Sequence, residues 1–263
     1  SLSAACHLAK RGFEVEVFEK NSTLGGRARQ FKQDGFTFDM GPSWYWMPDV
    51  FERFFEGFGK KVSDYYKLER LDPGYQVVFG KDDVFPVYDS IEKIADRFEM
   101  EEKGSGRKLI SFLNQAKRNY DVAIDDLVYK PGVSPLELVT PVTVKNVGLF
   151  LTNVRKQVER DFKSPKLRSL LQFPVLFLGA KPEQTPAFYN FMNYADFGLG
   201  TWHPKGGMIQ IVNAMVSLAK ELGVRFHTDA PVGEILTKNK TATGICVEGT
   251  FHESDIIVSG ADY

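Results

Sequence analysis

The sequence is poor in the residues that build metal centres and disulfide frameworks. It has two cysteines, Cys6 and Cys246, and four scattered histidines among 263 residues. Two cysteines make neither a disulfide framework nor a metal site, which is typical of a reducing cytoplasm. We therefore expect no metal site, and we interpret a lone histidine such as His203 as a structural hydrogen-bonding residue. No Ser/His/Asp arrangement stands out, so no catalytic residue is assigned.

A long hydrophobic run and an excess of one charge are also missing. The longest near-apolar run, residues 170–180, is interrupted by Gln172 and Pro174. It is shorter than the about 20 residues that a transmembrane helix needs. The 33 basic and 34 acidic residues give a net charge of −1, so no overall field attracts nucleic acid. We expect a globular cytoplasmic protein and, because the chain begins at Ser1 without a methionine, a fragment truncated at both ends.

The start of the chain carries the pattern of a nucleotide-binding unit. Residues 1–12 predict a helix that ends at Gly12, and the alternation over residues 13–19 predicts a strand that ends at Glu19. In a βαβ nucleotide unit, an acidic residue at such a strand tip binds ribose hydroxyls, and a glycine-rich turn precedes the helix. We expect that turn upstream of Ser1. Taken alone, Glu19 could equally be a solvated residue at the end of a strand.

A glycine-rich turn follows the acidic strand tip. Consecutive glycines, Gly25 and Gly26, allow backbone N–H groups to approach phosphate oxygens, and Arg27 adds a charged fork. By itself this could be a plain turn. Together with the preceding helix, strand and Glu19, it favours a dinucleotide site.

The rest of the chain predicts strands near both ends and helices between them. A short strand is expected near residues 35–46, helices over residues 48–58 and 207–222, and strands over residues 75–79 and 83–88. Residues 90–172 read as largely helical. A strand is expected after Gly223, followed by three strand-like runs at residues 231–238, 242–249 and 254–260.

Four segments resemble a known family. The helix, the strand and the E-x5-G-G-R spacing are similar to the FAD-binding start of the amine-oxidase and phytoene-desaturase superfamily. The segments DMGPSWYWMPDVFE (39–52), FLGAKPEQTPAFYNFMNYADFGLGTWHPKGGM (177–208) and VSGADY (258–263) resemble the bacterial-type phytoene desaturases. The resemblance implies an α/β fold: a Rossmann-like FAD-binding domain of the glutathione-reductase/amine-oxidase type, with an interleaved α+β substrate domain. The expected domains are residues 1–72 (FAD-binding), 73–203 (substrate, largely helical) and 204–263 (return to FAD-binding).

The same resemblance implies FAD as cofactor and gives candidate site residues. Glu19, with Lys20 beside it, is expected to bind the adenosine ribose, and the double-glycine turn the pyrophosphate. The flavin is expected above Gly41 and Pro42, and the adenine against the backbone of Val232. The cofactor residues are thus Glu19, Lys20, Gly25, Gly26, Arg27, Gly41, Pro42 and Val232, and the substrate-side residues are Trp202, Pro204, Gly206 and Gly207.

The implied function is FAD-dependent desaturation of a carotenoid precursor, phytoene towards lycopene, by hydride transfer to flavin. Another carotenoid desaturase or saturase stays open, as does an amine or porphyrinogen oxidase. So does a non-enzymatic lipid-binding escort like the dissociation inhibitors of prenylated GTPases. The Phe-rich residues 171–197 favour a hydrocarbon substrate, and the E-x5-G-G-R pattern favours a flavin over an escort. The family's C-terminal flavin segment is missing, so we expect this fragment alone to hold FAD weakly.

The expected partner is a long apolar isoprenoid, which places the protein peripherally on the inner face of the cell membrane. Residues 144–162 put an apolar stripe (Val147, Leu151, Val154, Val158 and Phe162) beside basic residues (Lys145, Arg155, Lys156 and Arg160). Such a helix can lie on an anionic bilayer or pack on the core with a solvated basic face. Both interpretations stay open.

Overall fold

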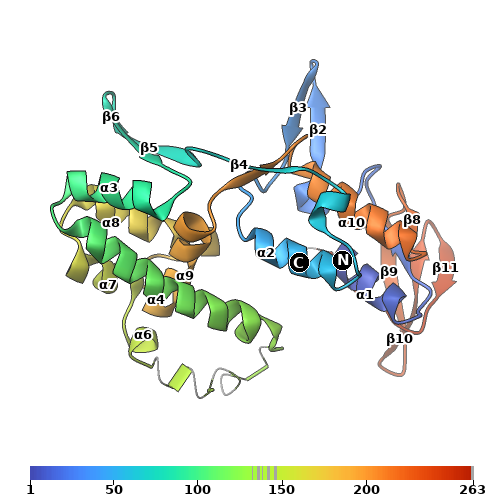
Figure 1. Ribbon diagram of the computed structural model, residues 1–263. Helices are drawn as coiled ribbons and strands as arrows, with labels where there is room; N and C mark the ends of the chain where they lie inside the picture. Colours follow the sequence, from blue (N-terminus) through green and yellow to red (C-terminus); the bar gives the residue numbers. More distant parts are fainter. Residues whose placement is uncertain (132, 135–136, 138, 141–142, 145–146, 262–263) are drawn as a thin grey trace. The chain divides into compact units, whose positions relative to one another are not determined.

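The computed structural model divides the chain into two compact units (Figure 1). Unit 1 contains Ser1–Ser43, Phe55–Leu68 and Pro204–Tyr263, and unit 2 contains Trp44–Phe54 and Glu69–His203. The structure describes all residues except 132, 135–136, 138, 141–142, 145–146 and 262–263. Lys145 and the last two residues of the VSGADY segment therefore lie outside the described residues. The predicted domain boundaries stay a prediction.

Unit 1 combines two helices with short sheets. Strands β1 and β8 pair in parallel, β9, β10 and β11 form an antiparallel sheet in the order β11-β10-β9, and β2 and β3 form a hairpin. Its elements are α1 (Leu2–Lys10), β1 (Glu16–Phe18), η1 (Gly26–Ala28), β2 (Gln30–Gln33), β3 (Phe36–Asp39), η2 (Val62–Asp64), α10 (Ile209–Glu221), β8 (Arg225–His227), β9 (Val232–Lys238), β10 (Thr241–Val247) and β11 (Thr250–Glu253).

Helix α1 confirms the predicted first helix. It ends where expected, because Gly12 takes a positive φ of 88° and donates its N–H to the Ala9 carbonyl at 2.9 Å. The helix packs on α10 through small buried residues, Ala5 and Cys6, and the Cys6 thiol lies 3.8 Å from the Met215 carbonyl oxygen. Burial raises the pKa of the Cys6 thiol to about 11, which favours the unreactive thiol over the thiolate.

Two predicted strands of unit 1 differ from the structure. The first is shorter than residues 13–19, since ladder pairing with β8 covers only Glu16–Phe18. The run at residues 254–260 is not a strand, and the prediction there was wrong. Strand β11 precedes it and pairs with β10, whereas residues 254–260 have no ladder partner among the described residues. A short apolar run forms a strand only where a second strand supplies the hydrogen bonds.

Unit 2 is mainly helical. Helices α3 and α4 lie against each other, as do α7 and α8, and Figure 1 shows α4 as the long helix along which this unit is built. Its elements are β5 (Tyr75–Gly80), β6 (Asp83–Val87), α3 (Ile91–Glu101), α4 (Ser105–Asp125), η3 (Leu127–Tyr129), α6 (Val147–Leu151), α7 (Val154–Asp161), α8 (Pro165–Gln172), η5 (Phe173–Leu178), η6 (Ala187–Asn190), α9 (Phe191–Asn193) and the π-helical turn η7 (Tyr194–Gly198). Three more, α2 (Pro48–Glu56), β4 (Leu68–Arg70) and β7 (Trp202–Pro204), contain a boundary between the units in their sequence.

The core of unit 2 uses the phenylalanine-rich composition. The fully buried ring of Phe98 meets Phe85, Phe162 and Phe197 edge-to-face, with centroid distances of 5.8, 5.9 and 6.4 Å. Such offset ring pairs add about 0.5–1.5 kcal/mol each beyond the burial of their area. The rings come from β6, α3, η7 and the end of α7, so they tie distant parts of the chain together.

The predicted continuous helix over residues 144–162 is interrupted. Helix α6 ends at Leu151 and α7 begins after Asn153, whose side chain caps the new helix by accepting the Lys156 N–H at 2.8 Å. The apolar stripe is divided with it. Val147 and Leu151 are exposed, whereas Val154, Val158 and Phe162 are fully buried in the core. The second half of the stripe therefore packs on the core. None of the helices in the described part of the chain combines the length and the apolar character that a membrane-spanning segment requires.

Candidate functional site

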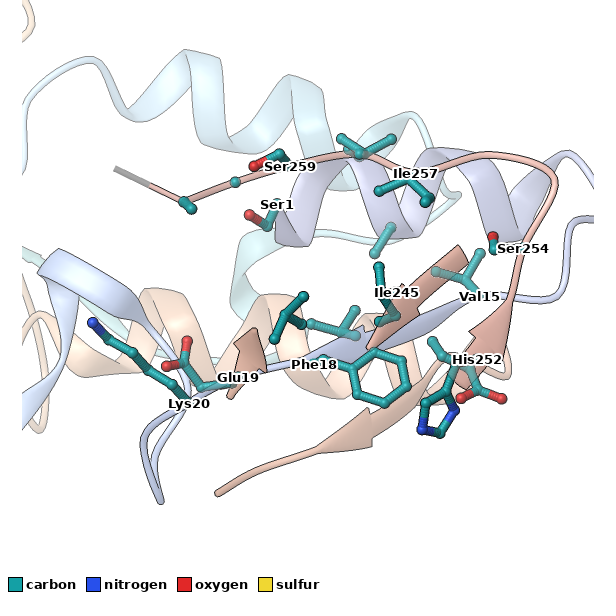
Figure 2. A pocket seen from close by; sticks show the side chains of 18 of the residues that line it. Ser1, Val15, Phe18, Glu19, Lys20, Ile245, His252, Ser254, Ile257 and Ser259 are labelled. Carbon is teal, nitrogen blue, oxygen red and sulfur yellow. The ribbon is translucent and has the colours of Figure 1, made fainter. Parts of the chain in front are cut away.

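A large cavity in unit 1 collects most of the residues predicted to bind the cofactor (Figure 2). It has a volume of about 1460 Å³ and is lined by the start of α1, by β1 and by residues 231–235 and 252–261. Six of the eight predicted residues line it: Glu19, Lys20, Gly26, Arg27, Gly41 and Val232. Gly25 and Pro42 are not among the lining residues, although each is next to one in the sequence.

Glu19 lies at the tip of β1. Its backbone is fixed by β8 and the following loop, because its N–H donates to the His227 carbonyl and its carbonyl accepts from Ala230, both at 2.9 Å. Asn21 donates its backbone N–H and its side-chain amide to Glu19 Oε1, at 2.9 and 2.6 Å. Within the described part of the chain, Oε2 accepts no hydrogen bond. Figure 2 shows the Glu19 and Lys20 side chains at one end of the cavity and His252 towards the other. The tip thus offers one oriented carboxylate oxygen to a ligand.

Further acidic and basic side chains line the cavity along β1 and β8. Glu16 accepts from Arg225 at 2.5 Å and lies 3.0 Å from His227 Nε2. The hydrogen bond from Arg225 lowers the pKa of the Glu16 carboxyl, and the nearby charge of Arg225 adds to the effect. The positive charge of Arg225 on β8 is therefore paired with the carboxylate of Glu16 on β1. Lys20 and Arg27 bring further positive charge to the lining.

The double-glycine turn and the DMGP segment are in contact. A Cβ added to Gly41, where φ is +84°, would lie 2.3 Å from the Arg27 carbonyl oxygen. A Cβ on Gly25 would lie 3.2 Å from a methyl carbon of Val212 on α10. Since real Cβ atoms do not approach a backbone oxygen this closely, Gly41 is required for the turn to rest on this segment. The structure therefore brings together two motifs that are about 14 residues apart in the sequence.

Asp39 connects a third motif to the other two, and sequence reasoning missed its role. Its carboxylate accepts the backbone N–H groups of Met208 and Ile209, at 2.7 and 3.3 Å, and so caps the start of α10. A Cβ on Gly207 would lie only 2.6 Å from Asp39 Oδ2. Asp39 lies within the segment that carried the resemblance, but a partner 169 positions away leaves no signal in a single sequence.

The four predicted substrate-side residues are divided between the two units. Pro204, Gly206 and Gly207 belong to unit 1, where Pro204 is buried and both glycines have a positive φ. Trp202 belongs to unit 2, where its indole N–H donates to the Leu199 carbonyl at 2.9 Å and the Arg70 guanidinium lies 5.6 Å from its ring. Their role stays a prediction.

The remaining polar candidates do not gather into a metal centre. His203 is exposed, and the described residues contain no group of three His, Cys, Asp or Glu side chains arranged to hold a metal ion.

The donor set of the cavity suits an adenosine diphosphate group. A carboxylate oxygen at a strand tip accepts sugar hydroxyls. A glycine turn followed by Arg27, with Lys20 also in the cavity lining, suits phosphates. The volume exceeds the 300–1,000 Å³ or so of ordinary ligand pockets, so a large dinucleotide can enter.

Comparison with known proteins identifies the family. The family model described as flavin containing amine oxidoreductase matches residues 2–263. The chain belongs to this family. The prediction of a flavin cofactor is confirmed at this level.

Curated relatives narrow the resemblance within this flavin family. The chain is 43% identical over 265 residues to the carotenoid 3,4-desaturase of Haloarcula japonica, covering 100% of this chain and 54% of the relative. It is 35% identical over 264 residues to the zeta-carotene-forming phytoene desaturase of Myxococcus xanthus, covering 99% and 51%. The predicted resemblance to carotenoid desaturases is confirmed. The chain spans about half the length of these relatives.

Solved structures agree on the fold. An oxidoreductase from Methanosarcina mazei matches with a TM-score of 0.60 at 20% identity, over 97% of this chain and 55% of that one. Wild-type putrescine oxidase bound to putrescine matches with a TM-score of 0.54 at 18% identity, over 94% and 52%. RAB GDI from Plasmodium falciparum matches with a TM-score of 0.61 at 12% identity, over 97% and 61%. At these identities the likeness shows the amine-oxidase-like fold alone.

Proposed function

We propose that the full-length protein is an FAD-dependent carotenoid desaturase that acts on phytoene or a closely related polyene precursor. Unit 1 would supply a Rossmann-like FAD-binding domain of the glutathione-reductase/amine-oxidase type, and unit 2 would supply the substrate domain. The observation that carries the proposal is the cavity in which Glu19, Lys20 and the double-glycine turn meet. The family description and the desaturase names of the relatives support it.

Each cofactor residue has a specific role in this proposal. Glu19 Oε2 accepts the adenosine ribose hydroxyls, while Asn21 holds Oε1 and so orients the carboxylate. Gly25, Gly26 and Arg27 would bind the pyrophosphate, and the backbone of Val232 would contact the adenine. Gly41 and Pro42 would hold the flavin end of the cofactor. The Arg27–Gly41 contact links the pyrophosphate end to the flavin end of this site.

Desaturation removes a hydride and a proton from adjacent carbons of the polyene. When bound, the flavin supplies the hydride acceptor, which is the chemically demanding part of the reaction. This chain's residues then position the hydrocarbon and exclude water from it. Trp202, Pro204, Gly206 and Gly207 would border the substrate.

A carotenoid precursor is dissolved in membrane, so the enzyme must reach it there. We place the protein peripherally on the inner face of the cell membrane, with an apolar surface towards the lipid. The exposed apolar residues Val147 and Leu151 of α6 would suit such a surface, whereas the buried residues of α7 would not. An escort without flavin shares the fold, but Glu19 and the double-glycine turn would then have no ligand.

Expression of the full-length gene in cells that accumulate phytoene tests the proposal. The expected result is a coloured pigment with the absorption bands of a longer conjugated polyene. The purified protein should be yellow, with a flavin spectrum. Unchanged phytoene would contradict the desaturase function, and a colourless protein would favour an escort.

A further inference from the structure

A cluster of aromatic rings in unit 2 lies outside all predicted site residues. We call it the aromatic wall and define it by Trp44, Trp46, Tyr75, Phe173 and Phe177. Trp44 is its centre, with ring centroids 4.5 Å from Tyr75, 5.7 Å from Phe173 and 5.6 Å from Phe177. Trp46 lies 5.4 Å from Trp44 and 4.9 Å from Phe177. The wall is a continuous set of ring contacts.

One edge of the aromatic wall is exposed. Leu176, Phe177 and Leu178 are 56%, 51% and 42% exposed, because η5 turns them outward while its residues Pro174 and Val175 are buried. Three consecutive large apolar side chains next to two tryptophans form an apolar surface patch. Patches of this kind mark sites where a soluble protein binds an apolar partner.

Two polar side-chain groups of the aromatic wall have hydrogen-bond partners within unit 2. The Trp46 indole N–H donates to Thr201 Oγ1 at 2.8 Å. The Tyr75 hydroxyl donates to Asp196 Oδ2 at 2.6 Å, and Asp196 is buried. Apart from the Trp44 indole N–H, the wall therefore presents the carbon atoms of its rings and of the neighbouring leucines. A ligand with polar groups would lose hydrogen bonds to water here without replacement, whereas a hydrocarbon loses none.

Asp196 holds Tyr75 at the back of the aromatic wall. It lies in the π-helical turn η7, and such turns are frequent at functional sites. Asp196 Oδ1 and the side-chain amide of Asn193, three residues earlier, have no hydrogen-bond partner among the described residues. An unsatisfied buried polar atom destabilises the folded state, so stability alone does not explain an acid at this position.

We infer that the aromatic wall binds the apolar polyene chain of the substrate and that Asp196 is a positioning residue that fixes the wall through Tyr75. This inference rests on the proposed function, since it assigns a surface to the same hydrocarbon substrate. An extended polyene can lie along the faces of Trp44 and Phe177, where stacked rings and a conjugated chain gain dispersion contacts.

Steady-state kinetics of the full-length enzyme tests the inference, with phytoene in phosphatidylcholine liposomes as the probe. Phe177→Ala and Trp44→Ala should raise KM about tenfold, equivalent to about 1.4 kcal/mol, with kcat and flavin content nearly unchanged. Phe79→Ala is the matched control, because Phe79 is an exposed aromatic residue of unit 2 outside the wall. It should leave KM unchanged. Phe177 is half exposed, so its truncation tests the wall even if Trp44→Ala fails to fold.

A second pair of variants tests the positioning role. Tyr75→Phe keeps the ring but loses the bond to Asp196, and should raise KM severalfold at constant kcat. Asp196→Asn keeps an acceptor for the Tyr75 hydroxyl and should behave like the wild type. If the wild type converts phytoene but Phe177→Ala has an unchanged KM, the aromatic wall does not bind the polyene. If Tyr75→Phe has an unchanged KM, Asp196 does not position the wall. A wild type that carries no flavin and leaves phytoene unchanged would instead overturn the proposed function and the inference with it.

Discussion

Replacing Gly41 by alanine tests the contact that joins the double-glycine turn to the DMGP segment. The new Cβ would lie 2.3 Å from the Arg27 carbonyl oxygen, and the residue would keep a φ of +84°. The left-handed backbone costs an alanine about 1–2 kcal/mol. Crowding of a packed site costs a further 1–3 kcal/mol or so. We expect Gly41→Ala to lower the free energy of unfolding by about 2–5 kcal/mol.

Gly223→Ala is the matched control for this variant. Gly223 has nearly the same φ, +87°, but an added Cβ there meets nothing within 4 Å. The free energy of unfolding of Gly223→Ala should fall only by the cost of the left-handed backbone, about 1–2 kcal/mol. Urea unfolding of the full-length protein, followed by circular dichroism, measures both values. The flavin content of each purified variant shows whether displacement of the Arg27 turn also releases the cofactor. If Gly41→Ala proves no less stable than Gly223→Ala, the turn does not rest on Gly41.

Other predictions concern single side chains. Asp39→Ala removes the acceptor for the Met208 and Ile209 N–H groups and should lower the free energy of unfolding by about 0.5–2 kcal/mol. Asp39→Asn should lower it less. Equal stability of the wild type and both variants in urea or thermal unfolding would contradict the cap. Burial raises the pKa of Asp196 from 3.8 to about 8, so the folded protein keeps the proton that the unfolded chain releases between these pH values. The free energy of unfolding should therefore fall as pH rises from 4 to 8, by up to about 1.4 kcal/mol per pKa unit. Urea unfolding at pH 5 and pH 8 should show a smaller fall for Asp196→Asn than for the wild type. An identical fall in both proteins would contradict the raised pKa of Asp196. Cys246 should react with a thiol reagent at pH 8 well before Cys6, whose pKa is raised to about 11, and simultaneous labelling would contradict the burial of Cys6.

Local patterns predicted much of the fold. The first helix, the hairpin of β5 and β6, helix α10 and the strands β8 to β10 follow from periodicity and from glycines at helix ends. The errors arose where a pattern depends on what lies beside it. Residues 254–260 contain an apolar run typical of a strand but have no ladder partner among the described residues. The helix over residues 144–162 is divided by a capping Asn153 within its apolar stripe.

The sequence predicted only those parts of the candidate site that depend on residues close together in the chain. Glu19 and the double-glycine turn are close in sequence, so their spacing indicated a nucleotide site, and both reach the cavity. Asp39 and the aromatic wall depend on residues more than 100 positions apart. A single sequence without an alignment carries no record of such contacts, and only the folded chain brings them together.

The central claim is that Glu19 and the double-glycine turn bind the adenosine diphosphate half of FAD. Titration of the full-length apoprotein with FAD, followed by flavin fluorescence, measures the affinity directly. Glu19→Gln keeps the shape of the side chain but replaces the negatively charged carboxylate, proposed to accept the ribose hydroxyls, by a neutral amide. It should weaken FAD binding about tenfold or more, equivalent to at least about 1.4 kcal/mol. Glu248→Gln, an exposed acid of unit 1 away from the cavity lining, should bind like the wild type. Equal dissociation constants for the wild type and Glu19→Gln would contradict the claim.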